Sequence, residues 1–352
     1  MKIVTVIGAR PQFIKALPVS RALQAAGVNE LLVHTGQHYD HKMSGIFFDQ
    51  LDLPKPYTNL EVGSGSHGLQ TATMLSKIEA ILLAEKPDWM LVYGDTNSTI
   101  AGALAAVKLH IPIAHVEAGL RSFNRRMPEE HNRVLTDHCS DLLLCPTDTA
   151  IENLRREGVT KNVHQIGDVM LDALLMFSET AARQPALAEI NAAERAYYLA
   201  TIHRAENTDD PARLNAILTA LGGLPLPVFV PLHPRTRKIL RDLPPGTFDS
   251  QQIRIIEPLG YLDMISAVLR SRAVLTDSGG LQKESVWLGI PCITLRDETE
   301  WIETLEDGFN QVVGASTARI LAACAALPAV RAPRRAGADE SASLQCAKLL
   351  VA

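Results

Sequence analysis

KIVTVIGARPQFIKALPVSRALQAAG (residues 2–27) joins an apolar, β-branched run directly to an amphipathic stretch that ends in glycine. The run 2–8 has the composition of a buried strand. The stretch 11–27 predicts a helix, because glycine is common just after the last helical turn. A strand followed at once by a helix is the repeating unit of a parallel α/β sheet.

The same alternation continues along the 352 residues, a length comfortable for two domains. Further strands are predicted at 30–36, 89–95, 111–117, 141–147, 163–167, 197–203, 227–233, 253–258, 273–278 and 291–296. The Ala- and Glu-rich stretch 168–195 predicts a helix, and a fresh series of strands follows it. We therefore predict two doubly wound domains, 1–168 and 169–337, with a last helix at 344–352 that packs back on the first.

Composition excludes several classes of protein. Hydrophobic residues make up 47% of the chain and the formal net charge is −5, so a nucleic-acid binder is not expected. Five scattered cysteines without a C-x-x-C pair indicate reduced thiols and a cytoplasmic protein. Residues 1–11 are predicted to form a strand and a turn, so they are not expected to be a signal peptide, and no apolar run reaches the roughly 18 residues of a membrane span. His38 and His41 lack further ligands at metal spacing, so no metal site is expected.

Polar, small or charged residues follow six of the predicted strands. Ligands bind beyond the carboxyl ends of the strands in an open parallel sheet, so these positions are candidates for a site. They are Gly8-Ala9-Arg10, Gly94-Asp95-Thr96, Glu117-Ala118-Gly119, His203-Arg204, His233-Pro234-Arg235 and Asp277-Ser278-Gly279-Gly280.

Each acid in the first half has a structural alternative. Asp95 could cap the helix that follows it, and Glu117, at the end of a buried strand, could be neutralised by Arg121 or Arg133. Glu129 could simply lie in the first turn of a helix, where acids favour the helix dipole. Its i, i+4 spacing from Arg133 would place both side chains on one helix face.

The strongest single element is LTDSGGLQKESVWLG (275–289). A strand that runs into Ser278, Gly279 and Gly280 and then into a helix directs backbone N–H groups and the helix dipole at an anion. Glu284 lies early in that helix, where it could accept hydrogen bonds from a ribose diol. The pattern predicts a nucleotide or phosphate site.

Two histidines also end strands in the second half. His203 is a candidate acid–base residue, since the ordinary histidine pKa lies near neutral pH. His233, with arginines behind it, suits a diphosphate. Packing for His203, and a solvated basic turn for His233, are the open alternatives.

Several of these motifs recur in a fixed order along residues 1–314. They are GARPQFIKALP, TGQHYDHKMSGIFFDQL, VYGDTNSTIAGALAA, HVEAGLRS with MPEEHNR, TIHRAEN, PLHPRT, EPLGYL and LTDSGGLQKES. In this order they closely resemble the non-hydrolysing UDP-N-acetylglucosamine 2-epimerase family. The resemblance implies two Rossmann-like doubly wound α/β domains in a glycosyltransferase-B arrangement, with the active site in the interdomain cleft. It also implies a cytoplasmic homodimer that requires neither a metal nor a nicotinamide cofactor.

The family inverts C2 of a UDP-2-acetamido sugar. A base removes the C2 proton while UDP leaves C1, and UDP adds back to the glycal with a proton delivered to the opposite face. Carried over residue by residue, the resemblance implies catalytic roles for Asp95, Glu117, Glu129 and His203, Glu129 being the first Glu of the P-E-E motif. It implies substrate binding by Arg10, Lys15, Arg133, His233, Ser278, Gly279, Gly280 and Glu284.

The sequence departs from the family pattern at two places. The family's T-E-R-P-E reads Thr299-Glu300-Trp301-Ile302-Glu303, so Trp301 stands where arginine is common. With GDVM (167–170), this looks like the subgroup that acts on UDP-2,3-diacetamido-2,3-dideoxy-glucuronate for O-antigen and lipopolysaccharide synthesis. QHYDHKMS (37–44) differs from the version in enzymes that their own substrate activates.

Two other functions are compatible with the same nucleotide-binding features. A UDP-sugar glycosyltransferase of this fold would use the DSGG turn and Glu284, and a non-catalytic sensor would bind UDP-sugar without turnover. A glycosyltransferase would not need the three acids Asp95, Glu117 and Glu129, and a sensor would tolerate their loss. The epimerase is therefore the expected function.

Overall fold

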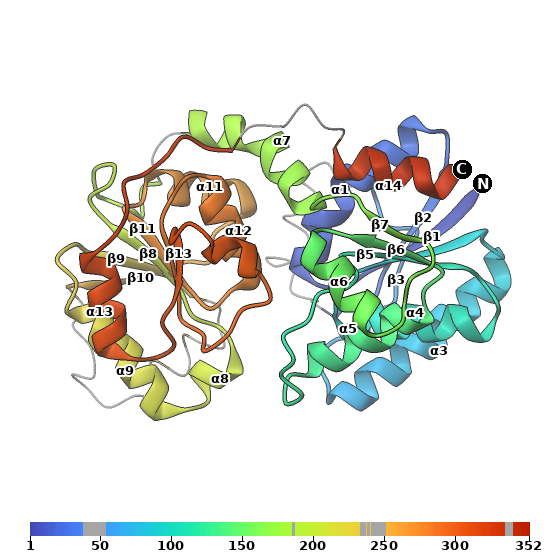
Figure 1. Cartoon of the computed structure of the whole chain (residues 1–352), viewed down its shortest axis with the longest axis horizontal. Coiled ribbons are helices and arrows are strands. Elements are labelled where there is room, and N and C mark those ends of the chain that lie inside the picture. The colour runs from blue at the N-terminus through green and yellow to red at the C-terminus, as the bar shows by residue number, and fades with distance from the viewer. Residues whose placement is uncertain (38–53, 185–186, 233–236, 238–239, 241–250, 335–340) are drawn as a thin grey trace. The chain divides into compact units, whose positions relative to one another are not determined.

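The computed structural model describes residues 1–37, 54–184, 187–232, 237, 240, 251–334 and 341–352. The chain divides into two compact units, Met1–Ala173 with Ala336–Ala352, and Leu174–Arg335 (Figure 1). Each unit contains a parallel sheet covered by helices. No helix among the described residues is long and apolar enough to cross a membrane.

The sheet of the first unit has seven strands within the described residues, all parallel, in the order β3-β2-β1-β4-β5-β6-β7. The strands are β1 Lys2–Ile7, β2 Asn29–His34, β3 Thr58–Asn59, β4 Trp89–Tyr93, β5 Ile113–Val116, β6 Leu142–Cys145 and β7 Val163–Gln165. The helices are α1 Arg10–Ala25, α3 His67–Glu85, α4 Asn97–Lys108, α5 Pro128–Cys139, α6 Asp148–Arg156 and α14 Ala342–Val351. Helix α7, Val169–Arg183, spans the boundary between the units.

The sheet of the second unit has six described strands, also parallel, in the order β10-β9-β8-β11-β12-β13. The strands are β8 Tyr198–Thr201, β9 Val228–Pro231, β10 Ile253–Ile256, β11 Ala273–Thr276, β12 Cys292–Thr294 and β13 Asn310–Val312. The helices are α8 Ala205–Thr208, α9 Pro211–Gly222, α11 Tyr261–Arg270, α12 Gly279–Trp287 and α13 Thr317–Ala325, with a 3₁₀ turn η1 at Ile302–Leu305.

In both sheets the strand order reverses at a central pair of strands. The chain leaves β1 toward β2 and β3 and then returns to the other side of β1 as β4. The second unit does the same between β8 and β11. Ligands of open α/β sheets bind at the carboxyl ends of strands at such switch points. Asp95 follows β4, His203 follows β8 and Ser278 follows β11, so three predicted site residues lie at these positions.

Buried aliphatic side chains hold each sheet to its helices. Val4 and Val6 of β1 pack in one cluster with Met74 and Ile78 of α3. In the second unit, strands β8, β9 and β11 contribute to a cluster with Leu214 of α9. Because both faces of a parallel sheet are covered, its strands are continuous apolar runs, which is why they could be predicted from sequence.

Every predicted strand is present, and two short strands, β3 and β13, were not predicted. The last helix forms as α14 and packs against α1, with Ser343 donating its backbone N–H to Asp172 Oδ2 at 2.7 Å. The predicted helix at 11–27 begins at Arg10 and ends at Ala25, and Gly27 follows with φ 73°.

Candidate active site

Glu117 has an unusual backbone conformation. It follows β5 with φ 72°, a left-handed conformation that glutamate rarely adopts. Such a conformation costs of order 1–3 kcal/mol and persists only where the surrounding structure imposes it. Glu117 is buried, and its carboxylate forms an ion pair with Lys15 Nζ of α1. Strained residues of this kind cluster at active sites.

Gly94, at the end of β4, makes room for the Lys15–Glu117 pair. A Cβ on Gly94 would lie 3.1 Å from Glu117 Oε2 and 3.6 Å from Lys15 Nζ. Burial disfavours the ammonium, but the adjacent carboxylate of Glu117 outweighs burial and raises the pKa of Lys15 above its ordinary value. Lys15 is therefore charged at neutral pH, and it neutralises Glu117. Arg121 and Arg133 were the partners considered from sequence, and Lys15 was not among them.

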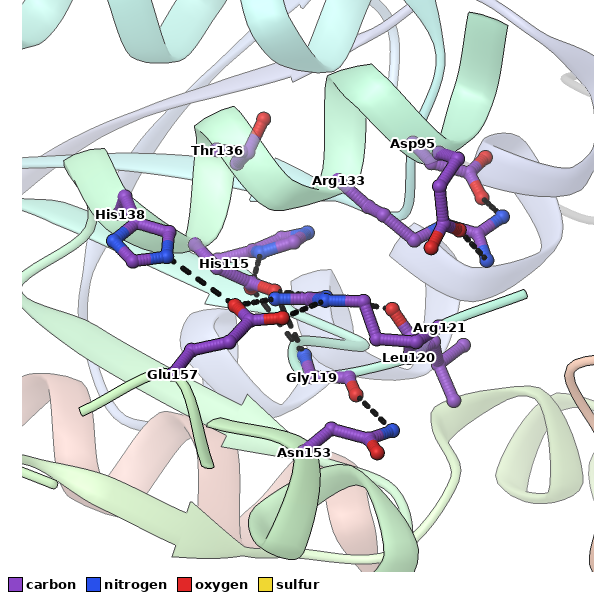
Figure 2. A network of polar contacts seen from close by, with 12 residues as sticks. Asp95, His115, Gly119, Leu120, Arg121, Arg133, Thr136, His138, Asn153 and Glu157 are labelled. Atoms are coloured by element: carbon purple, nitrogen blue, oxygen red, sulfur yellow. Dashed lines mark hydrogen bonds and ion pairs between the residues drawn. The ribbon is translucent and has the colours of Figure 1, made fainter. Parts of the chain in front are cut away.

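Asp95 does not cap the helix that follows it. The N-cap of α4 is Thr96, whose hydroxyl accepts a hydrogen bond from the backbone N–H of Thr99. Asp95 instead forms an ion pair with Arg133 of α5 (Figure 2), and 30% of its side chain remains exposed. The helix-cap alternative is wrong, and Asp95 presents a carboxylate at the carboxyl edge of the sheet.

The structure separates the roles of Glu129 and Glu130. Glu130 is buried and accepts from the backbone N–H of Ser122 at 2.9 Å and of Phe123 at 2.8 Å. It also lies 3.2 Å from Arg133 Nη1, so the ion pair that Arg133 forms within α5 is the i, i+3 pair with Glu130. Glu129 is half-buried and has no hydrogen-bond or ion-pair partner among the described residues.

His203 lies at the carboxyl end of the second sheet and is oriented by Asp277. Its Nδ1 lies 3.1 Å from Asp277 Oδ1, and 51% of its side chain is exposed. Asp277 is fully buried and accepts the backbone N–H groups of His203 and Arg204 and the amide of Asn207, each at 3.1 Å. Burial opposes its charge, but the contact with His203 and these hydrogen bonds lower the pKa of Asp277. Asp277 is thus an anion that holds the Nδ1 edge of the imidazole.

The predicted anion-binding turn is formed as expected between β11 and α12. Ser278 is the N-cap of α12 and accepts from the backbone N–H of Leu281 at 3.4 Å. Gly279 and Gly280 open the helix, and Glu284 is buried one turn further along. The first-turn N–H groups of α12 therefore lie at the carboxyl edge of the second sheet, where an anion is favoured.

Trp301 lies directly beside this turn. A Cβ on Gly279 would lie 3.4 Å from Trp301 Nε1 and 2.7 Å from Glu300 Oε1. Trp301 is buried, and the ammonium of Lys283 lies 3.4 Å from the centre of its ring, a cation–π contact. The residue that departs from the family pattern thus packs against a cation of α12.

Of the remaining residues considered from sequence, the structure describes Arg10 but not His233, His38 or His41. Arg10 is half-buried at the first position of α1. His233 lies outside the described residues, as do His38 and His41, the pair at which no metal site was expected. Across the described ranges, no group of three His, Cys, Asp or Glu side chains is placed to hold a metal ion.

We expect Gly119→Ala to destabilise the first unit more than Gly158→Ala does. Both glycines have φ 81°, so alanine pays the same left-handed cost of about 1–2 kcal/mol at either position. A Cβ on Gly119 would also lie 2.3 Å from the carbonyl oxygen of Ala150, whereas nothing lies within 4 Å at Gly158. Urea unfolding should show an additional loss of roughly 1–3 kcal/mol for Gly119→Ala, and equal losses would contradict the close packing.

Comparison with known proteins agrees with this geometry. The family model described as UDP-N-acetylglucosamine 2-epimerase matches residues 21–342. A UDP-2,3-diacetamido-2,3-dideoxy-D-glucuronate 2-epimerase of Pseudomonas aeruginosa is 54% identical over 90% of this chain and 89% of its own length. A UDP-N-acetylglucosamine 2-epimerase homolog of Methanococcus maripaludis is 53% identical over 91% of each chain.

A solved structure extends the comparison to the fold. The UDP-GlcNAc 2-epimerase of Methanocaldococcus jannaschii, in complex with UDP-GlcNAc and UDP, matches with a TM-score of 0.91 and 42% identity. The match covers 100% of this chain and 99% of that one. The expected class of two Rossmann-like α/β domains is confirmed, and the chain belongs to the UDP-N-acetylglucosamine 2-epimerase family.

Proposed function

We propose that the protein inverts the configuration at C2 of a UDP-2-acetamido sugar by eliminating UDP and adding it back. One observation carries the proposal: Asp95 and Glu117, at the ends of the adjacent strands β4 and β5, each pair with a cation of the same unit. A glutamate held in a left-handed conformation against an ammonium is a costly arrangement that packing alone does not require. It supplies two carboxylates that are held in place beside cations.

The chemistry requires a proton to leave C2 on one face and to return on the other. In the proposed cycle a carboxylate takes the C2 proton as the C1–O bond breaks, giving a glycal and UDP. A second group then donates a proton to the opposite face of C2 while the diphosphate oxygen re-forms the bond to C1. Asp95, Glu117 and Glu129 are the proposed acid–base groups.

The second unit would bind the nucleotide. The N–H groups at Ser278–Gly280 suit the diphosphate, and Glu284 suits the ribose hydroxyls. His203, oriented by the Asp277 anion, is proposed to donate a proton or hydrogen bond to the departing diphosphate. Arg10, Lys15, Arg133 and His233 complete the proposed substrate-binding set. Lys15 and Arg133 would act there while paired with Glu117 and Asp95.

Deuterium incorporation tests the proposal directly. Incubation with UDP-N-acetylglucosamine in D₂O, and separately with UDP-2,3-diacetamido-2,3-dideoxy-glucuronate, should give a C2-epimerised product that carries deuterium at C2. Failure to exchange with either sugar would rule out the proposal. Transfer of the sugar to an acceptor without C2 exchange would instead indicate a glycosyltransferase, which the relatives do not favour.

We propose the diacetamido glucuronate as the preferred substrate, for synthesis of a cell-surface polysaccharide such as O-antigen. The relative named for that activity is 54% identical, next to 53% for the UDP-N-acetylglucosamine 2-epimerase homolog of Methanococcus maripaludis and 45% for a UDP-N-acetylglucosamine 2-epimerase of Methanocaldococcus jannaschii. Trp301 supports the same choice. It stands where arginine is common in the family, and tryptophan cannot make the bidentate contacts of an arginine, so the substrate is not simply carried over as UDP-N-acetylglucosamine.

We expect kcat/KM for the glucuronate to exceed that for UDP-N-acetylglucosamine by at least about tenfold. The reason is that Trp301 cannot make the charged contact of the family's arginine, and the loss of such a contact typically costs about 1.5–3 kcal/mol. Steady-state assays with both sugars at matched enzyme concentration measure the ratio. A ratio near one, or a preference for UDP-N-acetylglucosamine, would contradict the substrate assignment and leave the epimerase proposal intact.

A cytoplasmic location, a homodimeric state and independence from added metal or nicotinamide are further parts of the proposal. Light scattering of the purified protein tests the dimer. Activity after exhaustive dialysis against EDTA tests the metal independence.

A further inference from the structure

His115 lies two residues before Glu117 and contacts the turn that carries Asp95. It is the third residue of β5 and is fully buried. Its Nε2 lies 2.8 Å from the carbonyl oxygen of Gly94, the residue before Asp95. A carbonyl can only accept, so Nε2 carries a hydrogen and donates it.

The other ring nitrogen of His115 faces a buried carboxylate. Nδ1 lies 2.7 Å from Asp137 Oδ1, and neither side chain is exposed to solvent. Burial alone would raise the pKa of Asp137, but hydrogen bonding and charge from His115 and Arg121 lower it, so the carboxylate is ionised. Both ring nitrogens of His115 therefore face acceptors, so each is placed to donate a hydrogen bond.

Asp137, on α5, also contacts the turn that carries Glu117. It accepts the backbone N–H of Gly119, two residues after Glu117, at 3.1 Å. Arg121 Nη1 donates to Asp137 at 2.7 Å, and the rest of that guanidinium holds Glu157 through two hydrogen bonds of 2.7 and 2.6 Å. Arg121 thus lies between the carboxylates of Asp137 and Glu157, and Asp137 lies between Arg121 and His115. Each buried charge of this network therefore has a neighbour of opposite charge.

We propose that His115 and Asp137 are positioning residues that fix the spacing between the turns bearing Asp95 and Glu117. The inference rests on the proposed epimerase function. His115 holds the carbonyl of one turn and Asp137 holds the N–H of the other, while a direct contact joins the two side chains. Neither residue touches substrate in this scheme. A displacement of about 1 Å between catalytic groups can cost roughly 10²-fold in rate, and the two side chains prevent it.

The test compares His115→Asn and Asp137→Asn with a control at the outer end of the same network. Glu157→Gln weakens the hold on Arg121 but leaves the contacts of His115 and Asp137 with both turns intact. We expect the first two variants to lose about 10²-fold in kcat for C2 exchange, with KM and UDP binding little changed. Glu157→Gln should lower Tm and keep the wild-type kcat.

The outcomes are distinguishable. Wild-type protein that exchanges no deuterium at C2 would fail the epimerase proposal itself. A folded His115→Asn variant with wild-type kcat, or a Glu157→Gln variant with the same loss of kcat, would overturn the positioning role alone. If neither His115 nor Asp137 can be replaced without unfolding, long-range ¹H–¹⁵N spectra of the wild-type protein decide. Hydrogen on both ring nitrogens of one slowly exchanging histidine supports the proposal, and its absence overturns it.

Discussion

Glu117→Gln is expected to lower kcat for C2 exchange by about 10²- to 10⁴-fold, with UDP binding unchanged. Glutamine matches the size of glutamate, but its amide cannot take or return the C2 proton. Deuterium incorporation followed by NMR measures turnover, and calorimetry with UDP measures binding. Glu152→Gln is the matched control, since that carboxylate lies on α6 and, among the residues that the structure describes, pairs with Arg155 and Arg156 alone, at the surface.

Loss of turnover must be separated from loss of the fold. In Glu117→Gln the buried ammonium of Lys15 would face an amide, and removing one partner of a buried pair typically costs about 3–5 kcal/mol. The double variant Lys15→Met/Glu117→Gln removes both charges and should recover part of that stability without recovering turnover. Normal exchange by the single variant would contradict the assignment of Glu117 as an acid–base group.

The strands were predictable from sequence because parallel strands buried on both faces are apolar over their whole length. β3 and β13 escaped because they consist of Thr58–Asn59 and Asn310–Val312, which are short, mostly polar and lie at sheet edges. Their pairing depends on the neighbouring strand and not on their own side chains. Sequence patterns carry little information about such segments.

The position of the candidate site was also predictable, because polar residues recur where strands end. The partners of those residues were not. Lys15 reaches Glu117 across 102 positions of sequence, and nothing local distinguishes it from Arg121 or Arg133. Whether Asp95 or Thr96 caps α4 depends on a helix start that differs by a single residue. Sequence-based boundaries are not that accurate.

His115 shows a different limit. A lone histidine within an apolar strand is more often a packing residue, and its sequence neighbours do not indicate otherwise. Its role depends on Asp137, 22 residues further along on α5, and on a carbonyl 21 residues before it. Only the folded sheet brings these three groups together.

The two adjacent acids of α5 should respond oppositely to the same substitution. We expect Glu129→Gln to lose about 10²-fold or more in kcat with no change in Tm, because Glu129 forms no hydrogen bond or ion pair with the described residues. We expect Glu130→Gln to destabilise the protein by roughly 1–3 kcal/mol. Thermal unfolding and C2 exchange of the two variants, measured side by side, give the comparison.

The reason lies in what Glu130 holds. Its two oxygens accept from the backbone of Ser122 and Phe123, and Phe123 adopts φ 58°, a strained conformation for an aromatic residue. In glutamine, the NH₂ group would point at one of these N–H donors, so a hydrogen bond would be lost and the strain would oppose folding. Activity loss in a stable Glu130→Gln, together with normal turnover in Glu129→Gln, would transfer the acid–base role to Glu130. The opposite pattern would show that the first glutamate of P-E-E serves chemistry while the second holds the loop beside it.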